Sequence, residues 1–362
     1  MFCYHKSIFA QMSSEIKVQD IRLLSQEQLV ALLKELGEPG FRGRQIYEWL
    51  WKKGARSFAE MTNLSLALRE KLEANFEINA LKLDVKQVSE DGTIKCRFKL
   101  FDGFKIEAVL IPVPKYSRFT VCVSTQVGCS LTCAFCATGK MKRERNLDAG
   151  EIYDQVHMVG QICQETYDLP LTNIVYMGMG EPLLNYANVL TSVELITSPE
   201  GLGMSSKRIT VSTAGIAKMI RKLADDKVKF NLALSLHAAD DDKRNEIMPI
   251  NSQNDLESLH EAITYFKAEC TKSKLTFEYI AFADFNDGEE DAHALADFAK
   301  GLYATINIIE YNQVDGVKFT KTTEDRLDRF ATILTNRGIS VTVRRSRGRD
   351  IDAACGQLAN KG

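Results

Sequence analysis

Between residues 118 and 345 the sequence alternates between short apolar runs and longer amphipathic segments that have the periodicity of a helix. Parallel strands need long crossover connections, which are usually helices, so this alternation predicts an α/β fold with a parallel sheet. The sheet is expected to be either barrel-like or doubly wound. The predicted strands cover residues 118–124, 173–178, 208–213, 229–236, 275–282, 305–311 and 339–345.

The segments that flank this α/β domain have different patterns. Residues 1–82 are expected to form a small helical domain, because three short stretches show a 3.6-residue apolar period. Residues 83–117 alternate with period two around two Asp-Gly turns, which predicts a short antiparallel β extension that links the domains. Residues 346–362 have no long periodic face, so we expect a loose C-terminal tail.

Composition restricts the cellular location. The chain has no apolar run near the roughly 18 residues that span a bilayer, and its first residues are too broken in hydropathy for a secretory signal. A disulfide scaffold is usually a short chain with many, paired cysteines, whereas this long chain has nine, an odd number. We therefore expect a cytoplasmic protein that does not associate with membranes. Because the net charge is only −2, any nucleic-acid binding must come from local basic patches.

Three cysteines lie close together with the spacing C-x3-C-x2-C, namely Cys129, Cys133 and Cys136, and Cys122 shortly precedes them. A structural zinc site takes four protein ligands, usually as two separated pairs, whereas three clustered thiolates leave one position open. Iron–sulfur clusters are commonly held by cysteine thiolates, so the segment predicts a [4Fe–4S] cluster with one iron free to bind a substrate. Zinc or buried free thiols are the alternatives.

Glycines and small polar residues follow the predicted strands at their carboxyl ends. The segment "YMGMGEP" (176–182) combines glycines, which let a ligand approach the backbone, with a carboxylate. A single Ser or His at such a place is more often a cap or a structural residue. Their shared placement on the rim where α/β barrels form active sites predicts a ligand-binding set. The candidates are Gly180, Glu181, Ser212, Ser235, Leu236, His237 and Asn312.

The cysteine motif, with Phe135 just before its last cysteine, resembles the signature of the radical S-adenosylmethionine superfamily. That resemblance implies a partial (β/α)6 barrel with the cluster loop after its first strand. The strings "VSTQVGCSLTCAFCATG", "MGMGEP", "SLHA", "MPIN" and "DIDAACGQL" resemble the dual-specificity RNA adenine-C2 methyltransferase family over nearly the whole chain, including an N-terminal domain of RNA-binding type. The chain departs from the family pattern at Glu310 and Gln313, which flank the "YN" pair where prolines are expected.

The resemblance implies a reaction that uses two molecules of S-adenosylmethionine per turnover. The first would methylate Cys355, which requires a thiolate and hence a surrounding that lowers its pKa. The second would yield the radical that converts this S-methylcysteine into a group able to add to adenine C2. Glu107 would accept the proton from the base, and Cys122 would release the product by forming a transient disulfide with Cys355. The seven ligand-binding candidates on the rim, named above, would contact the cofactor.

The implied partners are 23S rRNA, tRNA and an electron donor such as flavodoxin or ferredoxin, and the protein is expected to act as a monomer. RNA contacts are expected from the basic stretches 139–146 and 344–349, although a solvated surface is an equal alternative for each. The competing functions are methylation of adenine C8, as in the sister family, and a non-catalytic metal-containing RNA-binding module. Pro182 favours C2 over C8.

Overall fold

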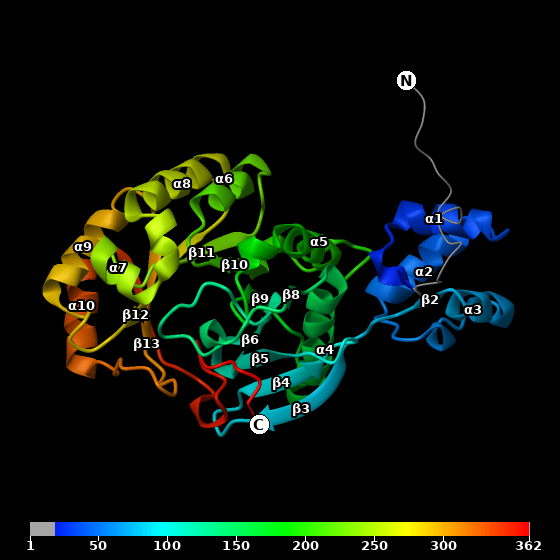
Figure 1. The fold of residues 1–362 in the computed structure, drawn as a ribbon, viewed down its shortest axis with the longest axis horizontal. Helices are drawn as coiled ribbons and strands as arrows, with labels where there is room; N and C mark the ends of the chain where they lie inside the picture. The colour runs from blue at the N-terminus through cyan, green and yellow to red at the C-terminus, as the bar shows by residue number, and fades with distance from the viewer. Residues whose placement is uncertain (1–18, 362) are drawn as a thin grey trace. The chain divides into compact units, whose positions relative to one another are not determined.

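The structure, a computed structural model, describes residues 19–361, which fall into two compact units. The first unit comprises residues 19–80 together with 200–202, and the second comprises residues 81–199 and 203–361 (Figure 1). None of the helices in the described residues combines the length and the apolar character that a bilayer crossing requires.

The first unit is mainly helical. Ser25 begins its first helix with reciprocal hydrogen bonds, because its hydroxyl accepts the Gln28 amide while the Gln28 side chain accepts the Ser25 amide. The first two helices contact closely at Gly43, where a Cβ would lie 2.6 Å from the backbone nitrogen of Val30. The unit contains β1 (Gln19–Asp20), α1 (Gln26–Glu35), α2 (Phe41–Trp51), α3 (Leu66–Glu73) and β2 (Phe76–Glu77), with β1 and β2 paired in parallel.

The second unit is built on one ten-stranded sheet with the order β14-β13-β12-β11-β10-β9-β6-β5-β4-β3. The seven strands from β14 to β6 run parallel, and each overlaps a strand predicted from the sequence. They are β6 (Arg118–Cys122), β9 (Asn173–Tyr176), β10 (Ile209–Thr213), β11 (Asn231–Ser235), β12 (Leu275–Ala281), β13 (Thr305–Glu310) and β14 (Ser340–Arg344).

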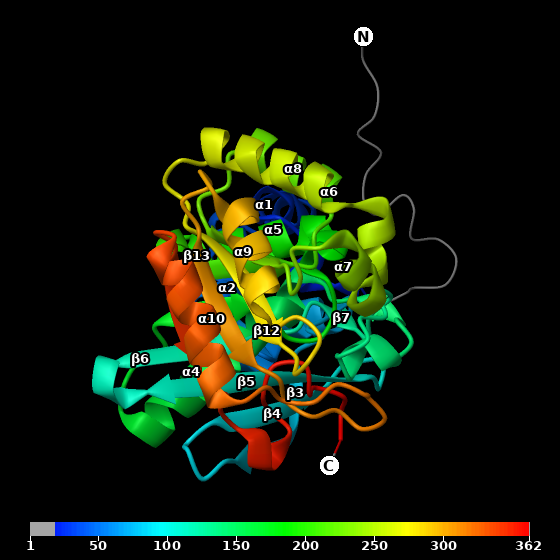
Figure 2. The ribbon, with the colours of Figure 1, turned by 90° about the vertical axis from the view of Figure 1, so that its left-hand side faces the viewer.

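The antiparallel β extension continues this sheet beyond β6. Its strands are β3 (Lys82–Val88), β4 (Ile94–Lys99) and β5 (Lys105–Val113), and β5 pairs antiparallel with β6 so that Val109 lies opposite Cys122. The parallel strands curve, and helices cover their outer face (Figure 2). The predicted α/β class with a partial barrel is confirmed. The helices are α4 (Ala149–Tyr167), α5 (Tyr186–Thr197), α6 (Ala217–Asp225), α7 (Asp241–Ile247), α8 (Leu256–Glu269), α9 (Glu289–Ala299) and α10 (Glu324–Asn336).

The C-terminal tail, residues 346–361, is docked on the second unit, so the prediction of a loose extension is wrong for these residues. Its apolar residues Ala353, Ala354 and Leu358 are buried. Its backbone is bonded to distant segments: the Thr138 hydroxyl donates to the Leu358 carbonyl at 2.6 Å, and the Ala137 amide donates to the Gly356 carbonyl at 2.7 Å. A tail without periodicity can dock in this way because its contacts are individual polar bonds.

Candidate active site

The residues predicted to form the site gather at one edge of the sheet. Cys122 ends β6, and the cofactor-binding candidates lie at or just beyond the carboxyl ends of β9, β10, β11 and β13. Because these strands are parallel neighbours, their carboxyl ends meet on the same rim. The cluster loop, residues 128–137, follows the short strand β7 (Gln126–Val127) at this rim.

The cluster loop is fixed by apolar packing. Phe135 is buried, and its ring meets the His237 ring edge-on with centroids 4.8 Å apart and lies 5.7 Å from the ring of Phe282. The Ala134 amide donates to the Ile247 carbonyl at 2.9 Å. The aromatic residue of the cysteine motif therefore anchors the loop in the core of the second unit.

The three loop thiols are the donor type that holds iron–sulfur clusters. Among residues 19–361, no three His, Cys, Asp or Glu side chains converge closely enough to hold one metal ion. In a cluster each thiolate binds a different iron, so the thiols need only lie around a common volume. Burial raises the pKa of Cys129 to about 11, and the charges of Cys136 and Glu181 add to this effect. A bound cationic cluster would supply the charge that such thiolates require.

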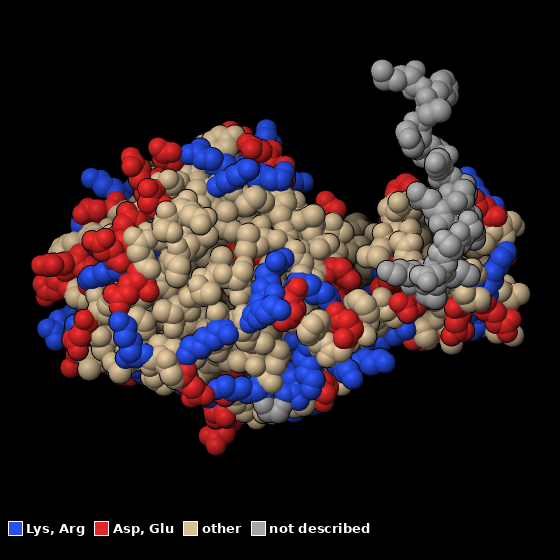
Figure 3. Space-filling view, viewed as in Figure 1, with Lys and Arg blue, Asp and Glu red and all other residues tan. Residues whose placement is uncertain are grey.

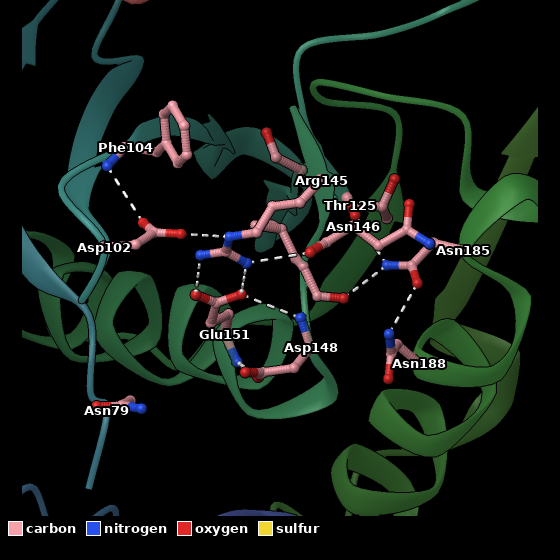
Figure 4. Close-up of polar contacts among 12 residues, drawn as sticks. Asn79, Asp102, Phe104, Thr125, Arg145, Asn146, Asp148, Glu151, Asn185 and Asn188 are labelled. Atoms are coloured by element: carbon pink, nitrogen blue, oxygen red, sulfur yellow. Dashed lines mark hydrogen bonds and ion pairs between the residues drawn. The ribbon is translucent and has the colours of Figure 1, made fainter. Parts of the chain in front are cut away.

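The segment after the cluster loop is held by an ion-pair network (Figure 4). Arg145, in the short strand β8 (Arg145–Asn146), makes two 2.7 Å bonds to the buried carboxylate of Glu151 in α4 and also bonds Asp102. Arg145 belongs to the basic stretch 139–146 that was predicted to contact RNA. Its guanidinium instead joins β8 to α4 and to the turn between β4 and β5.

The loop after β9 brings a carboxylate to the cluster loop. Gly180 has φ +94°, and a Cβ there would lie 2.5 Å from the Cβ of Gln126, so only glycine fits. The buried carboxylate of Glu181 accepts the Leu183 amide at 3.0 Å and the Ala214 amide at 2.8 Å. Burial raises the pKa of Glu181 to about 6, although these amides oppose the shift. A buried, hydrogen-bonded carboxylate beside the loop is suited to a cationic amino group.

Ser212, Ser235 and His237 lie on the next two strand ends. The Ser212 and Ser235 hydroxyls are 3.3 Å apart, so they form a small polar pair inside the barrel. The Ile280 amide donates to Nδ1 of His237 at 3.1 Å, which places the imidazole proton on Nε2. Burial and the nearby Arg244 lower the pKa of His237 to about 3, so the ring is neutral and does not serve as an acid or base near neutral pH.

Arg244 is a site residue that the sequence did not reveal. Its side chain is fully buried and donates to the Ala214 carbonyl at 2.6 Å, the Leu236 carbonyl at 3.1 Å and the Asn251 side chain at 2.5 Å. It thereby ties the loops after β10 and β11 together. Burial lowers the pKa of Arg244 to about 10, which still leaves it charged at neutral pH. The one available signal was its position three residues before Ile247, on the apolar face of α7.

The end of β13 joins the rim to the C-terminal tail. The amide nitrogen of Asn312 lies 3.4 Å from the carbonyl oxygens of both Glu310 and Cys355. The side-chain oxygen of Asn312 is buried and accepts no hydrogen bond from any described residue. A ligand at the rim could use this oxygen, because an unpaired buried acceptor is costly to leave unsatisfied.

Glu310, the departure from the family pattern, has a structural explanation. Its buried carboxylate accepts from Arg345 at 2.7 Å, from Lys321 at 3.2 Å and from the Ser346 amide at 3.4 Å, and it also bonds Arg349. Arg345 and Arg349 belong to the basic stretch 344–349 that was predicted to contact RNA. These arginines instead fix the beginning of the tail to the end of β13.

Cys122 ends β6 at the rim, and Cys355 lies in the docked tail next to Gly356, whose carbonyl accepts the Ala137 amide of the cluster loop at 2.7 Å. Burial raises the pKa of Cys122 to about 12, and the charge of Cys355 adds to the shift. Water reaches the Cys355 side chain, yet the surrounding protein raises its pKa to about 12 as well, with Cys136 contributing. The surroundings of Cys355 thus shift its pKa in the direction opposite to the predicted lowering.

Glu107 is not a solvated strand residue, because its side chain is only 1% exposed. One carboxylate oxygen accepts the Ala359 and Asn360 amides, both at 3.0 Å, and the other lies 3.5 Å from the Lys95 nitrogen. Glu107 thus holds the end of the C-terminal tail. The oxygen that faces Lys95 accepts no hydrogen bond from the described residues.

Fold and site together define a radical S-adenosylmethionine enzyme, a class that uses a [4Fe–4S] cluster and S-adenosylmethionine. Residues 123–296 match the radical SAM superfamily, and residues 19–78 match the N-terminal domain of ribosomal RNA large subunit methyltransferases. A crystal structure of a radical SAM methyltransferase from Sphaerobacter thermophilus is 39% identical and superposes with a TM-score of 0.89 over 95% of this chain and all of that one.

Curated relatives give the particular family. The chain is 58% identical to the probable dual-specificity RNA methyltransferase RlmN of Cytophaga hutchinsonii, over 96% of this chain and 95% of that protein. It is 54% identical to the protein of the same name in Christiangramia forsetii, over 95% of this chain and 97% of that one. The chain therefore belongs to the dual-specificity RNA methyltransferase RlmN family.

Proposed function

We propose that this protein methylates C2 of one adenosine in 23S rRNA and C2 of the adenosine next to the anticodon in tRNAs. The observation that supports the proposal is the docking of the tail on the cluster loop, where the Ala137 amide, next to Cys136, donates to the carbonyl of Gly356, next to Cys355, at 2.7 Å. The curated relatives described above are named as dual-specificity RNA methyltransferases. The expected setting is the cytoplasm, with a monomer that receives electrons from flavodoxin or ferredoxin.

The chemistry explains why a cysteine must carry the methyl group. Adenine C2 is an electron-poor carbon that does not attack a sulfonium methyl group. The methyl group therefore cannot pass directly from S-adenosylmethionine to C2 by nucleophilic displacement. When bound, the [4Fe–4S] cluster and S-adenosylmethionine supply a methyl group in one step and a hydrogen-abstracting radical in another. In the proposal Cys129, Cys133 and Cys136 hold the cluster. The cofactor contacts are Gly180, Glu181, Ser212, Ser235, Leu236, His237 and Asn312.

Each catalytic residue has a distinct task. The Cys355 sulfur accepts a methyl group and loses its proton. The S-methyl group later loses one hydrogen atom, and its carbon bonds to C2 of the base. Glu107 accepts the proton that leaves C2, and the electron left on the adduct would return to the redox-active cluster that the three loop cysteines would hold. The Cys122 sulfur then attacks the Cys355 sulfur, so that a disulfide forms while the sulfur–carbon bond breaks and the released carbon takes up a proton. An external thiol must reduce the disulfide before the next turnover.

Glu107 must be free to take part in this sequence. It accepts hydrogen bonds from two amides of the tail and lies beside Lys95. Movement of the tail when RNA enters would release the carboxylate oxygen that holds residues 359–360. The proposal therefore couples proton acceptance by Glu107 to undocking of the end of the tail.

Trapping the covalent adduct tests the mechanism. Cys122→Ala is expected to accumulate RNA joined to Cys355, detected by denaturing gels and by mass analysis of the digested adduct. Cys355→Ala should form neither adduct nor methylated base, while it retains the iron of the cluster. Cys270→Ala, which removes a buried thiol in α8's C-terminal turn, is the matched control and should behave as the unmodified protein.

The outcomes separate the competing functions. Methylated base without any adduct in Cys122→Ala would contradict the role given to Cys122. RNA binding that survives Cys355→Ala with no methylation by the unmodified protein would support a non-catalytic RNA-binding module. Mass and NMR analysis of digested rRNA and tRNA, from cells with and without the gene, distinguishes C2 from C8 and identifies the substrates.

A further inference from the structure

The turn between β4 and β5, residues 100–104, lies at the same edge of the sheet as the candidate active site, beyond the carboxyl end of β6. Strand β5 runs antiparallel to β6, and Val109 pairs with Cys122, the last residue of β6. The part of β5 before Val109, and the turn before it, must therefore extend beyond the carboxyl end of β6. The contact of Asp102 with Arg145 in β8 is consistent with this placement beside the segment that follows the cluster loop.

Two phenylalanines are exposed in this turn, which we name the aromatic turn (residues 101–104). Phe101 is 58% exposed and Phe104 is 40% exposed. Exposed large apolar side chains that occur together usually mark an interaction site. By contrast, the other loop phenylalanines near the rim, such as Phe135 and Phe282, are buried.

The aromatic turn is held in place by the ion-pair network of Arg145. The guanidinium carbon of Arg145 lies 5.2 Å from the centre of the Phe101 ring, and Arg145 also bonds Asp102 and Glu151. The Phe104 amide donates to the Asp102 carboxylate at 3.2 Å, so both ends of the turn connect to the network (Figure 4). Fixed aromatic rings lose little conformational entropy when a partner stacks on them.

Basic residues flank the turn in sequence and precede β8, the strand that bonds it. Lys99 is exposed at the end of β4 and Arg143 is exposed before β8, whereas Lys105 pairs with Asp84 at 3.1 Å and Lys142 pairs with Glu144 at 3.5 Å. Figure 3 shows lysine and arginine side chains gathered over the region of β3 and β4, with some acidic side chains beside them. Aromatic rings flanked by cations match a single-stranded nucleic acid, whose bases stack while its phosphates attract the charges.

We propose that the aromatic turn binds unpaired nucleotides of the RNA substrate, with Phe101 and Phe104 stacking on bases next to the target adenosine. The inference rests on the proposed function and deepens it, because it names a surface that holds the RNA and the form of RNA that this surface accepts. A target base must be unstacked to reach a buried site, and proteins that recognise RNA by sequence mostly bind single-stranded loops, bulges and ends, where neighbouring bases are unpaired. Stacking tolerates different sequences, which suits an enzyme with two RNA substrates.

The test is the double variant Phe101→Ala, Phe104→Ala. Its apparent Kd for a 23S rRNA fragment and for tRNA, measured by fluorescence anisotropy, should rise about tenfold or more, because each lost stack weakens binding several-fold. Methylation of Cys355 by S-adenosylmethionine without RNA should not change in intact-mass spectra, which shows that the fold and the cofactor site are retained. The double variant Phe101→Trp, Phe104→Trp keeps two aromatic rings, so its RNA Kd should stay close to that of the unmodified protein.

Tyr116→Ala is the matched control. Tyr116 is 69% exposed and lies beneath Lys115, but it belongs to the turn between β5 and β6, at the opposite end of β5 from the aromatic turn. This variant should bind RNA as the unmodified protein does. An absence of methylation in the unmodified protein would refute the proposed function. The Kd values of the unmodified protein and the double alanine variant would still test the aromatic turn, because RNA binding is measured directly.

Two results would overturn the inference. One is an unchanged RNA Kd in the double alanine variant. The other is normal RNA binding combined with activity that is lost with flavodoxin as the reductant and kept with dithionite. The second result would assign the aromatic turn to the protein that donates electrons.

Discussion

The cluster loop and the C-terminal tail both deliver cysteines to the same rim, but they are attached in different ways. The cluster loop is attached through the ring of Phe135, which packs on His237 and Phe282 in the core. The tail has three buried apolar side chains, two of them alanines, and is otherwise attached through polar bonds to Glu310, Glu107 and other carboxylates. One attachment is apolar packing, and the other consists largely of hydrogen bonds and ion pairs.

The difference matches what each segment has to do. Apolar packing in a core leaves few alternative arrangements, so the thiols of the cluster loop are kept in one geometry. Polar bonds can be exchanged for bonds to water at a small net free energy. We infer that the tail can undock for RNA and dock again, while the cluster loop keeps its place throughout the reaction.

Removing the Phe135 ring should give the largest effect. We expect Phe135→Ala to lower the free energy of unfolding of the second unit by about 3–5 kcal/mol, since a buried aromatic ring is lost. The iron content after reconstitution should fall together with the unfolding free energy, as measured by chemical denaturation and iron analysis. Phe285 is partly buried and packs against the same group of core side chains as Phe135, so Phe285→Ala should have a smaller effect. Equal losses in both variants would contradict a special role for Phe135.

Neutralising Glu310 should loosen the tail and spare the cluster loop. In Glu310→Gln three cations lose their shared buried counter-ion, and charged hydrogen bonds of this kind contribute about 1.5–3 kcal/mol each. Hydrogen exchange in residues 346–361 should therefore accelerate more than tenfold, with unchanged iron content. Glu324→Gln is the matched control, because Glu324 bonds the same Arg345 at 2.9 Å from an exposed position. A rigid tail in Glu310→Gln would show that its apolar contacts suffice.

The features that the sequence predicted correctly are local ones. The strand-and-helix alternation identified all seven parallel strands, and short motifs at the strand ends located the rim. The docked tail could not be predicted, because its contacts join residues far apart and leave no periodic pattern. Ser89 and Asp350, for example, are 261 positions apart. Arg244 was missed for a related reason, since a buried arginine whose partners are mostly carbonyls looks like an ordinary charged helix residue.

The basic stretches show the same limit. Charge alone cannot distinguish a phosphate-binding arginine from one that bonds a carboxylate within the protein. Arg145, Arg345 and Arg349 each bond buried carboxylates, a fact that depends on Glu151 and Glu310 arriving from other elements. The roles of the individual site residues stay predictions, whereas the family and the fold are confirmed.

Acid should release the tail before it affects the cluster loop. Burial opposes ionisation of Glu310, but Arg345, Lys321 and Ser346 outweigh it, and the pKa of Glu310 lies below its usual value. A carboxyl group with a lowered pKa stabilises the docked state above the ordinary pKa of about 4.3, and this contribution is lost as the pH falls through the lowered value. Hydrogen exchange of the tail, corrected for its intrinsic pH dependence, should rise below about pH 4.

The Glu310→Gln variant provides the control for this pH effect. It should show a flatter pH dependence of tail exchange, because the titrating carboxyl group is missing. Asp91, which accepts the Gly348 amide of the tail, and Asp350, within the tail, also have lowered pKa values. Part of the pH dependence of tail exchange should therefore persist in Glu310→Gln. An identical pH profile in both proteins would exclude Glu310 as a source of the acid sensitivity.

Loss of a single hydrogen bond from an uncharged donor to the exposed Asp350 of the tail should give the smallest effect. The Ser89 hydroxyl donates to the Asp350 carboxylate at 2.6 Å, and this carboxylate also accepts the Glu90 amide at 3.2 Å. Ser89→Ala should weaken tail docking by about 1 kcal/mol, seen as roughly fivefold faster exchange near Asp350, because the second bond survives. Ser252→Ala, an exposed serine away from the tail, should leave exchange there unchanged. If Ser89→Ala loosened the tail as much as Glu310→Gln, the tail would dock cooperatively as one unit, and its attachment would resemble that of the cluster loop more than a set of separate polar bonds.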